Sequence, residues 1–470
     1  MTAELHFKSA FDLAAMIRRR ELKVSELMEA TIARIEALNP KFNAFCALRA
    51  DEAMAEARAL DERIAHGEAP GALAGLPLGV KDLEGVAGMK TTFGSKPFKD
   101  NLAREDSIQV ARLKAAGAIV IGKTNTPEFG FTPFTKNLLY GVTRNPWNAE
   151  RTSGGSSGGS SAALAAGMVP LTTGSDWGGS IRIPAAHTGC VGHKATQGLI
   201  PASPRLGMTT WVDFAMLGPL TRTVRDAAIY MDAVVGYHPA DASSLPHPGI
   251  SYSATLEQLP KKLRIAFHPD FGHVVQHDLL REVEKAVSAF HEMGYEITVL
   301  KDEVPEIADA WRTIGAFQSL SSLGGYIDQY REDFGRAFLA NLENAKRITW
   351  REYGEAYRVR TRFNEWARGV FERFDLLLTP TVAVEAYAAG GPPPNKIDGH
   401  PIHDIMHTIV FTHPFNMSGH PAVSVRAGFT DSGLPCGLQI VADRHHDHLV
   451  MQAAYAYEQA RPWNNHWARL

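Results

Sequence analysis

Helix-like and strand-like patterns of apolar residues alternate along most of the chain. Near the N-terminus, apolar residues recur every three or four positions, which predicts helices between residues 9 and 64. Ser9 and Ser25 are the expected N-caps of the first two helices, because serine hydroxyls accept hydrogen bonds from free backbone amides. Asn39-Pro40 is expected to end the second helix.

Beyond this helical region, short apolar runs predict strands that are separated by amphipathic helices. The expected strands are 75–80, 118–121, 263–267 and 296–300, and the expected helices are 107–116, 279–291 and one beginning near 449. Strands that alternate with helices are typical of an α/β fold.

Composition and charge narrow the class of protein. Of the 470 residues, 45% are hydrophobic and 21% are charged, which is typical of a folded globular protein. The net charge of -3 gives no excess of cations for nucleic-acid binding. Three widely spaced cysteines predict no disulfide framework. The N-terminus does not look like a signal peptide and no apolar run would span a membrane, so we expect a cytoplasmic protein without membrane association.

No internal repeat and no flexible linker divides the sequence. We therefore expect a single domain over residues 1–470. Residues 305–362 are helical in pattern and rich in aromatic residues, and 390–394 mark a long loop. The histidine-rich stretch 443–448 is interpreted as a solvated loop before a helix rather than as a metal site.

One motif has the spacing of a phosphate-binding loop without its chemistry. Gly117 to Thr124 matches G-x-x-x-x-G-K-T, but its variable positions are Ala-Ile-Val-Ile. Those residues favour a buried strand, whereas phosphate binding needs an open loop followed by a helix. We expect no nucleotide site here.

A serine- and glycine-rich segment, residues 153–161, runs directly into a strong helix former. This arrangement points free backbone amides at whatever lies before the helix, which favours a functional site over a linker. Two G-x-S-x-G matches are centred on Ser156 and Ser157. A nucleophile elbow would need an apolar strand before it, which residues 145–152 are not, so a Ser-His-Asp hydrolase remains only an alternative.

Two further motifs are ambiguous when taken singly. Gly178 and Gly179, beside Ser180, could leave amides open as an oxyanion hole or could simply form a tight turn. Lys81 follows an apolar strand and could be a surface charge or, if desolvated, a base.

Taken together, these motifs resemble the amidase signature family over essentially the whole chain. The motifs are Gly75 to Asp82, Gly154 to Gly159 and Gly174 to Arg182, with family-like pieces at 122–125, 143–147, 375–380 and 433–439. The resemblance implies a large mixed β-sheet covered by helices on both faces. It also implies an N-terminal helical segment (1–65), a signature core (66–240), a more variable segment with a helical cap (241–375) and a C-terminal part of the core (376–470).

The resemblance also assigns roles to individual residues, without a cofactor or a metal. It implies Ser180 as the nucleophile, Lys81 as the base, and Ser156 as the bridging serine after a cis Gly155–Ser156 bond. The implied oxyanion hole consists of the backbone amides of Trp177, Gly178, Gly179 and Ser180. The implied supporting residues are Asp176, Arg182 and Ser157. Because Lys81 must be neutral to act, we expect it to be buried and the carboxylate of Asp82 to be paired elsewhere.

The implied activity is hydrolysis of a small-molecule amide through an acyl-enzyme. Esters and carbamates remain open, and Trp177 with Phe129, Phe131 and Phe134 favours bulky or aryl substrates. One alternative is a catalytic amidotransferase component that releases ammonia from glutamine. Thr124 to Phe129 departs from the T-N-M-D-E-F typical of that component. A non-enzymatic binding module is a further alternative, and the oligomeric state, a homo-oligomer included, stays open.

Overall fold

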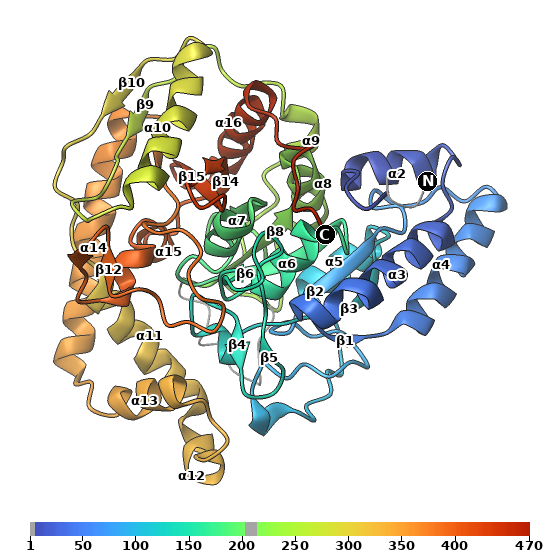
Figure 1. Cartoon of the computed structure of the whole chain (residues 1–470), viewed down its shortest axis with the longest axis horizontal. Coiled ribbons are helices and arrows are strands. Elements are labelled where there is room, and N and C mark those ends of the chain that lie inside the picture. Colours follow the sequence, from blue (N-terminus) through green and yellow to red (C-terminus); the bar gives the residue numbers. More distant parts are fainter. Residues whose placement is uncertain (1–4, 203–213) are drawn as a thin grey trace.

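The computed structural model describes residues 5–202 and 214–470, and a single large sheet runs through its centre (Figure 1). In spatial order the 11 strands are β1 (Phe45–Leu48), β3 (Ile119–Thr124), β2 (Pro77–Lys81), β6 (Leu171–Asp176), β8 (Met216–Thr221), β7 (Val191–Lys194), β14 (Ala422–Phe429), β15 (Pro435–Ala442), β11 (Leu376–Pro380), β9 (Ile265–Phe267) and β10 (Ile297–Val299). Strands β3, β2 and β6 are parallel to one another, as are β11, β9 and β10, while the remaining pairs are antiparallel. The expected mixed sheet is confirmed.

Helices surround this sheet. They are α2 (Ala10–Arg18), α3 (Val24–Phe42), α4 (Ala50–Ala65), α5 (Ile108–Ala115), α6 (Gly158–Ala165), α7 (Arg182–Thr188), α8 (Val224–Val234), α9 (Tyr252–Thr255), α10 (His277–Glu292), α11 (Ala308–Leu323), α12 (Ile327–Tyr330), α13 (Arg336–Ala345), α14 (Trp350–Arg373), α15 (His413–Met417) and α16 (Asp447–Ala460). Two short hairpins lie outside the main sheet: β4 (Lys136–Asn137) with β5 (Gly141–Val142), and β12 (Lys396–Ile397) with β13 (His400–Pro401).

The central strands are covered on both faces. Every residue of β2, β3, β6, β8 and β15 is buried, although neighbouring side chains of a strand point to opposite faces. Helix α6 is buried along its whole length and packs on β2 and β6, while α10 and α16 pack on β14 and β15. The core therefore holds α6, the helix that follows the serine-rich segment, rigidly beside the sheet.

The N-terminal helices begin as expected at one place and differ at another. Ser9 caps α2 by accepting a hydrogen bond from the Asp12 amide. Ser25 is not a cap, because α3 begins one residue earlier, at Val24. Its first amides, those of Val24 and Ser25, donate to the carboxylate of Asp61 in α4 at 2.8 and 3.0 Å. A carboxylate from a neighbouring helix thus replaces the expected serine cap.

Asn39-Pro40 does not end the second helix, which continues to Phe42 with Pro40 inside it. Pro40 lacks an amide hydrogen, so the helix loses one backbone hydrogen bond there, and only two further residues follow before it ends. The helix stops instead at Asn43, which adopts a left-handed conformation with φ of 51°.

The later segments agree with the expected pattern. Gly122, Lys123 and Thr124 lie within β3, so Gly117 to Thr124 forms no phosphate-binding loop. Helices α11, α12 and α13, which we call the helical cap, project from the sheet at the foot of Figure 1. Helix α14 then returns the chain to β11, and it lies on the side of the molecule opposite α2–α4 (Figure 1). In the described ranges, no helix has both the length and the apolar character that a membrane crossing requires.

Candidate active site

Parallel strands bring the sequence motifs to one edge of the sheet. Strand β2 ends at Lys81 and its parallel neighbour β6 ends at Asp176, so both carboxyl ends point the same way. Ser156 and Ser157 lie directly before α6, which packs on these two strands. The loop 177–181 joins β6 to α7 beside them. Residues about 100 positions apart in sequence thus meet at a single site.

The amine of Lys81 is fully buried among hydroxyl groups. Its Nζ lies 2.8 Å from Ser156 Oγ, 2.7 Å from Ser157 Oγ and 3.0 Å from Ser175 Oγ. It also lies 3.2 Å from the Ser175 carbonyl oxygen. The structure therefore brings together three residues from the sequence analysis and adds Ser175.

The two serines proposed for catalysis lie on adjoining segments. The Gly155–Ser156 peptide bond is cis, as the resemblance implied. The Ser157 amide donates to the Ser180 carbonyl oxygen at 3.1 Å, which ties the two segments together. Among the residues with described positions, the Ser180 hydroxyl has no hydrogen-bond partner, and no histidine hydrogen-bonds to Ser156, Ser157 or Ser180.

The loop before Ser180 presents backbone amides of two kinds. The Gly179 amide donates to Asp176 Oδ1 at 2.7 Å and is therefore already engaged. The amides of Gly178 and Ser180 have no acceptor within the described ranges, so they are available to an incoming oxyanion. Gly179 has φ of 124°, which a residue with a side chain rarely adopts.

A buried ion pair anchors this loop. Arg182 Nη2 lies 2.9 Å from Asp176 Oδ1, and both side chains have no exposed surface. Burial opposes ionisation of Asp176, but the charge of Arg182 outweighs it and lowers the pKa of that carboxyl well below its ordinary value. Asn416 and Gln439 complete the network, since each accepts a hydrogen bond from Arg182 at 2.7 Å.

The side chain of Trp177 packs against aromatic residues of other segments. Its ring stacks on Phe214 with centroids 5.6 Å apart and lies 5.0 Å from the ring of Trp311 in α11. Trp311 Nε1 donates to the Trp177 carbonyl oxygen at 3.0 Å. The first helix of the cap thus contacts the loop of the candidate oxyanion hole directly.

The carboxylate beside the candidate base is engaged elsewhere, as expected. Asp82 accepts hydrogen bonds from the amide and hydroxyl of Thr92, and its Oδ1 lies 3.8 Å from Lys123 Nζ. Burial raises the pKa of Asp82, and the charge of Lys123 acts against that shift.

The phenylalanines of the 129–134 segment take different positions. Phe129 is buried and packs on Phe338 of α13, so it belongs to the core under the cap. Phe131 is partly exposed and contacts Phe338 edge-on, and Phe134 contacts Tyr387. Phe131 and Phe134 therefore remain candidates for contact with a substrate.

Four residues of this site were not proposed from the sequence: Ser175, Trp311, Thr412 and Asn416. Ser175 lies inside a recognised motif, so its place beside Asp176 could have suggested it. Trp311, Thr412 and Asn416 reach the loop from more than 100 residues away, and no local pattern marks them.

Comparison with known proteins agrees with this geometry. The amidase family model matches residues 26–451. An acylamidase of Rhodococcus erythropolis is 37% identical, over 98% of this chain and 96% of that protein. A glutamyl-tRNA(Gln) amidotransferase component of Geotalea daltonii is 33% identical, over 99% of this chain and all (100%) of that protein.

The fold itself matches a solved enzyme. The crystal structure of a bacterial aryl acylamidase has a TM-score of 0.92 and 33% identity, covering 98% of this chain and 97% of that one. A family model that spans most of the sequence, together with relatives covered over nearly their full length, establishes the kinship. The chain belongs to the amidase signature family and is a hydrolase of carbon–nitrogen bonds other than peptide bonds.

Proposed function

We propose that the protein is a serine-dependent amidase in which Ser180, Ser156 and Lys81 form the catalytic triad. The observation that carries this proposal is the buried Lys81 amine, 2.8 Å from Ser156 Oγ. Burial disfavours an ammonium ion and so favours the neutral amine that a base must be. Since no histidine in the described ranges bonds to these serines, the geometry does not support the Ser-His-Asp alternative.

On this proposal the acylation step proceeds as follows. Ser180 Oγ attacks the amide carbonyl carbon and loses its proton to Ser156, while Ser156 passes its own proton to Lys81. The carbonyl oxygen becomes an oxyanion that accepts hydrogen bonds from the amides of Gly178 and Ser180. The carbon–nitrogen bond breaks as Lys81 returns a proton through Ser156 to the leaving nitrogen. Water then repeats the sequence on the acyl-enzyme and releases the acid.

The nucleophile is tested by Ser180→Ala. We expect a folded protein whose turnover falls by about four orders of magnitude or more, with no covalent labelling by a fluorophosphonate. Turnover near the wild-type rate would show that another residue attacks the substrate.

The proton path is tested by comparing two serines at nearly equal distances from Lys81. Ser156→Ala breaks the proposed relay, whereas Ser157→Ala removes only a neighbouring hydroxyl that orients the amine. We expect the acylation rate to fall much further for Ser156→Ala than for Ser157→Ala in single-turnover assays, and to be almost lost in Lys81→Met. Equal effects of the two serine changes would contradict the relay.

For the substrate we propose a bulky or aryl amide. The aromatic group of Trp177, Phe214 and Trp311 at the oxyanion loop supports this class, and so do relatives named acylamidase and aryl acylamidase. A screen of anilides, short aliphatic amides, esters and carbamates measures the preference. A clear preference for acetamide would contradict the aryl class.

The amidotransferase alternative is supported by relatives that carry that name, among them the Geotalea daltonii protein at 33% identity. It is separated from the amidase by assaying the purified chain alone. Hydrolysis of an anilide without any added partner supports the amidase, while ammonia release from glutamine only with a partner would support the alternative.

A further inference from the structure

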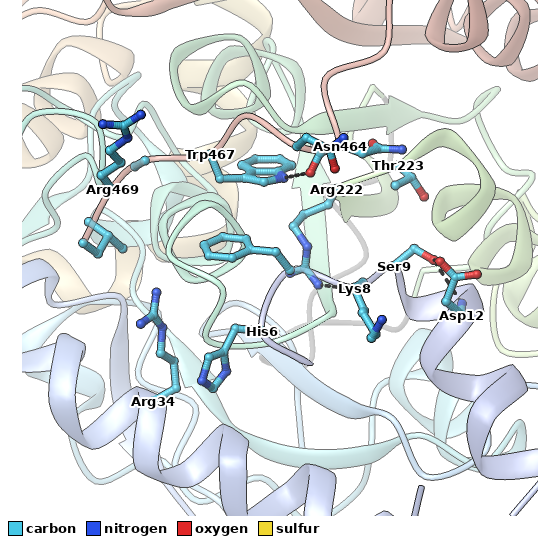
Figure 2. Close-up of a pocket in the computed structure, with 14 residues that line it drawn as sticks. His6, Lys8, Ser9, Asp12, Arg34, Arg222, Thr223, Asn464, Trp467 and Arg469 are labelled. Atoms are coloured by element: carbon cyan, nitrogen blue, oxygen red, sulfur yellow. Dashed lines mark hydrogen bonds between the residues drawn. The ribbon is translucent and has the colours of Figure 1, made fainter. Parts of the chain in front are cut away.

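A cavity lies away from the residues proposed for catalysis, between the two ends of the described chain (Figure 2). Its volume is about 780 Å³, and most of its lining comes from residues 6–9, 464–465 and 467–470. This volume is within the range of ligand sites for small molecules, about 300–1,000 Å³. None of the residues proposed for catalysis lines it, so a ligand there would not be the amide substrate.

The lining of this cavity is rich in cations. Lys8, Arg34, Arg222 and Arg469 all line it, whereas Asp12 is the one acidic side chain among the lining residues described. The Asp12 carboxylate already accepts a hydrogen bond from Ser9 at 2.7 Å. Within the described ranges, none of the four cations forms an ion pair.

Two of these cations are held by neutral groups. Arg34 Nη2 lies 3.0 Å from the Ala166 carbonyl oxygen, and Arg222 Nη1 lies 2.8 Å from the Val169 carbonyl oxygen. Carbonyl oxygens at and just after the end of α6 hold the guanidinium groups, and their partial negative charges offset only part of the positive charge. Asp226 interacts favourably with Arg222 but does not line the cavity.

His6 reports the resulting electrostatic potential. Its side chain lies beside Arg34 at the cavity wall (Figure 2). Burial lowers the pKa of His6, and the charges of Arg34 and Arg222 lower it further. A cavity that disfavours one more cation in this way favours an anion.

The cavity also offers an apolar surface. Phe7 and Trp467 both line it and stack with centroids 6.1 Å apart and planes 10° apart. Such a pair can contact a flat or apolar part of a ligand, while nearby cations bind its oxygen atoms.

We propose that this cavity binds a small organic anion whose carboxylate or phosphate oxygens lie in the positive potential of these four cations. Arg34 and Arg222 serve partly to hold the end of α6. No hydrogen bond or ion pair of the described chain gives the Lys8 and Arg469 side chains such a structural role. A bound anion would offset the positive charge that these four side chains give the cavity, and the aromatic pair accommodates the rest of the molecule.

The proposal is tested by titrating the whole protein with benzoate and with inorganic phosphate at constant ionic strength. We expect at least one of the two to raise the unfolding temperature in a saturable manner, because a ligand that binds only the folded state stabilises it. The response to each probe distinguishes a carboxylate site from a phosphate site.

The double variant Lys8→Gln/Arg469→Gln shows where the anion binds. We expect its dissociation constant for the probe to rise at least tenfold, measured by calorimetry. The matched control is Lys261→Gln/Lys262→Gln, which removes the same charge from exposed lysines outside the cavity and should leave binding unchanged. Equal affinity in both variants, or no saturable response to either probe, would overturn the proposal. Benzoate that binds at the catalytic site instead would bind the cavity variant as tightly as the wild type, which would also overturn the proposal.

Discussion

Two side chains hold consecutive peptide bonds of the candidate oxyanion loop from outside. Trp311 Nε1 donates to the Trp177 carbonyl oxygen at 3.0 Å, and Thr412 Oγ1 lies 2.7 Å from the Gly178 carbonyl oxygen. A carbonyl and the amide that follows it share one rigid plane, so fixing the oxygen also fixes the direction of the N–H. Trp311 therefore sets the direction of the Gly178 amide, one of the two that are available to an oxyanion.

Thr412 holds the next peptide plane, which carries the engaged Gly179 amide, so it tests with little change of volume whether the shape of the loop as a whole matters. Its hydroxyl also lies 2.9 Å from the Ile409 carbonyl oxygen, so its single proton is shared. Thr412→Val removes the donor and should lower kcat about tenfold with little change in KM, less than the loss of a whole oxyanion donor. Thr412→Ser keeps the hydroxyl and should retain near wild-type kcat. A fall in KM and kcat that is the same for both variants would point to packing alone.

Among single residues, the sequence predicts the candidate catalytic groups better than the side chains that hold them in position. Lys81, Ser156 and Ser157 lie in recognisable motifs, and the structure brings them within hydrogen-bond distance. Trp311 and Thr412 act through tertiary contacts, which leave no periodic or compositional trace in the sequence.

Among the elements, the helical cap is joined to the signature core by a buried carboxylate. Glu128 accepts hydrogen bonds from Ser95 Oγ and from the Gly335 amide, both at 2.7 Å. Gly335 is the N-cap of α13, where a negative charge is favourable. Burial raises the pKa of Glu128, and these two hydrogen bonds act against that shift.

Glu128→Ala should therefore loosen α13 more than the rest of the protein. Because Gly335 is only partly buried, loss of this acceptor should cost less than the about 1–3 kcal/mol of a fully buried unpaired amide, and hydrogen–deuterium exchange over residues 335–345 should accelerate. Glu128→Gln keeps an acceptor and should show a smaller effect. Exchange rates that rise equally throughout the protein in the alanine variant would argue against a local role.

The bounds of the helices and strands show which sequence patterns were sufficient to predict an element. The strands expected at 75–80 and 118–121 appear as β2 and β3, and the helix expected at 279–291 appears as α10. The start of α3 escaped prediction because its cap, Asp61, comes from another helix. The order of the strands also depends on pairing between distant segments, as between β7 and β14.

For the molecule as a whole, the buried carboxyl group of Glu458, where α16 packs on α8, should make the free energy of unfolding depend on pH. Burial raises the pKa of Glu458 to about 8, and the charge of Asp226 raises it further. The folded state thus holds a proton that the unfolded chain, with an ordinary glutamate, loses between about pH 4.5 and 8. Through this window the free energy of unfolding should fall as pH rises, by at most about 1.4 kcal/mol per pH unit for one proton.

Glu458→Gln mimics the protonated acid and isolates this contribution. We expect the variant to match the wild type near pH 5 and to be more stable than it at pH 9, measured by thermal or urea unfolding. Parallel stability curves of the two proteins across this range would show that Glu458 is already ionised in the folded state.

The general architecture could be predicted from the sequence, whereas the cation-lined cavity could not. Alternating strands and helices indicated an α/β protein, and ordered motifs indicated a family with one extensive sheet. The cavity beside Arg34 and Arg222 forms only where residues from both ends of the described chain meet, which no local pattern reveals.

Helix α6 has no residue at the surface, and the serines just before it share its burial. Directed evolution of a new selectivity therefore has almost no freedom in that helix, where each added atom would meet close-packed neighbours. Libraries are better placed in α11, where Trp311 reaches the oxyanion loop and other residues are partly exposed. With Trp311 itself kept, selectivity can then be varied with little change to the candidate catalytic groups.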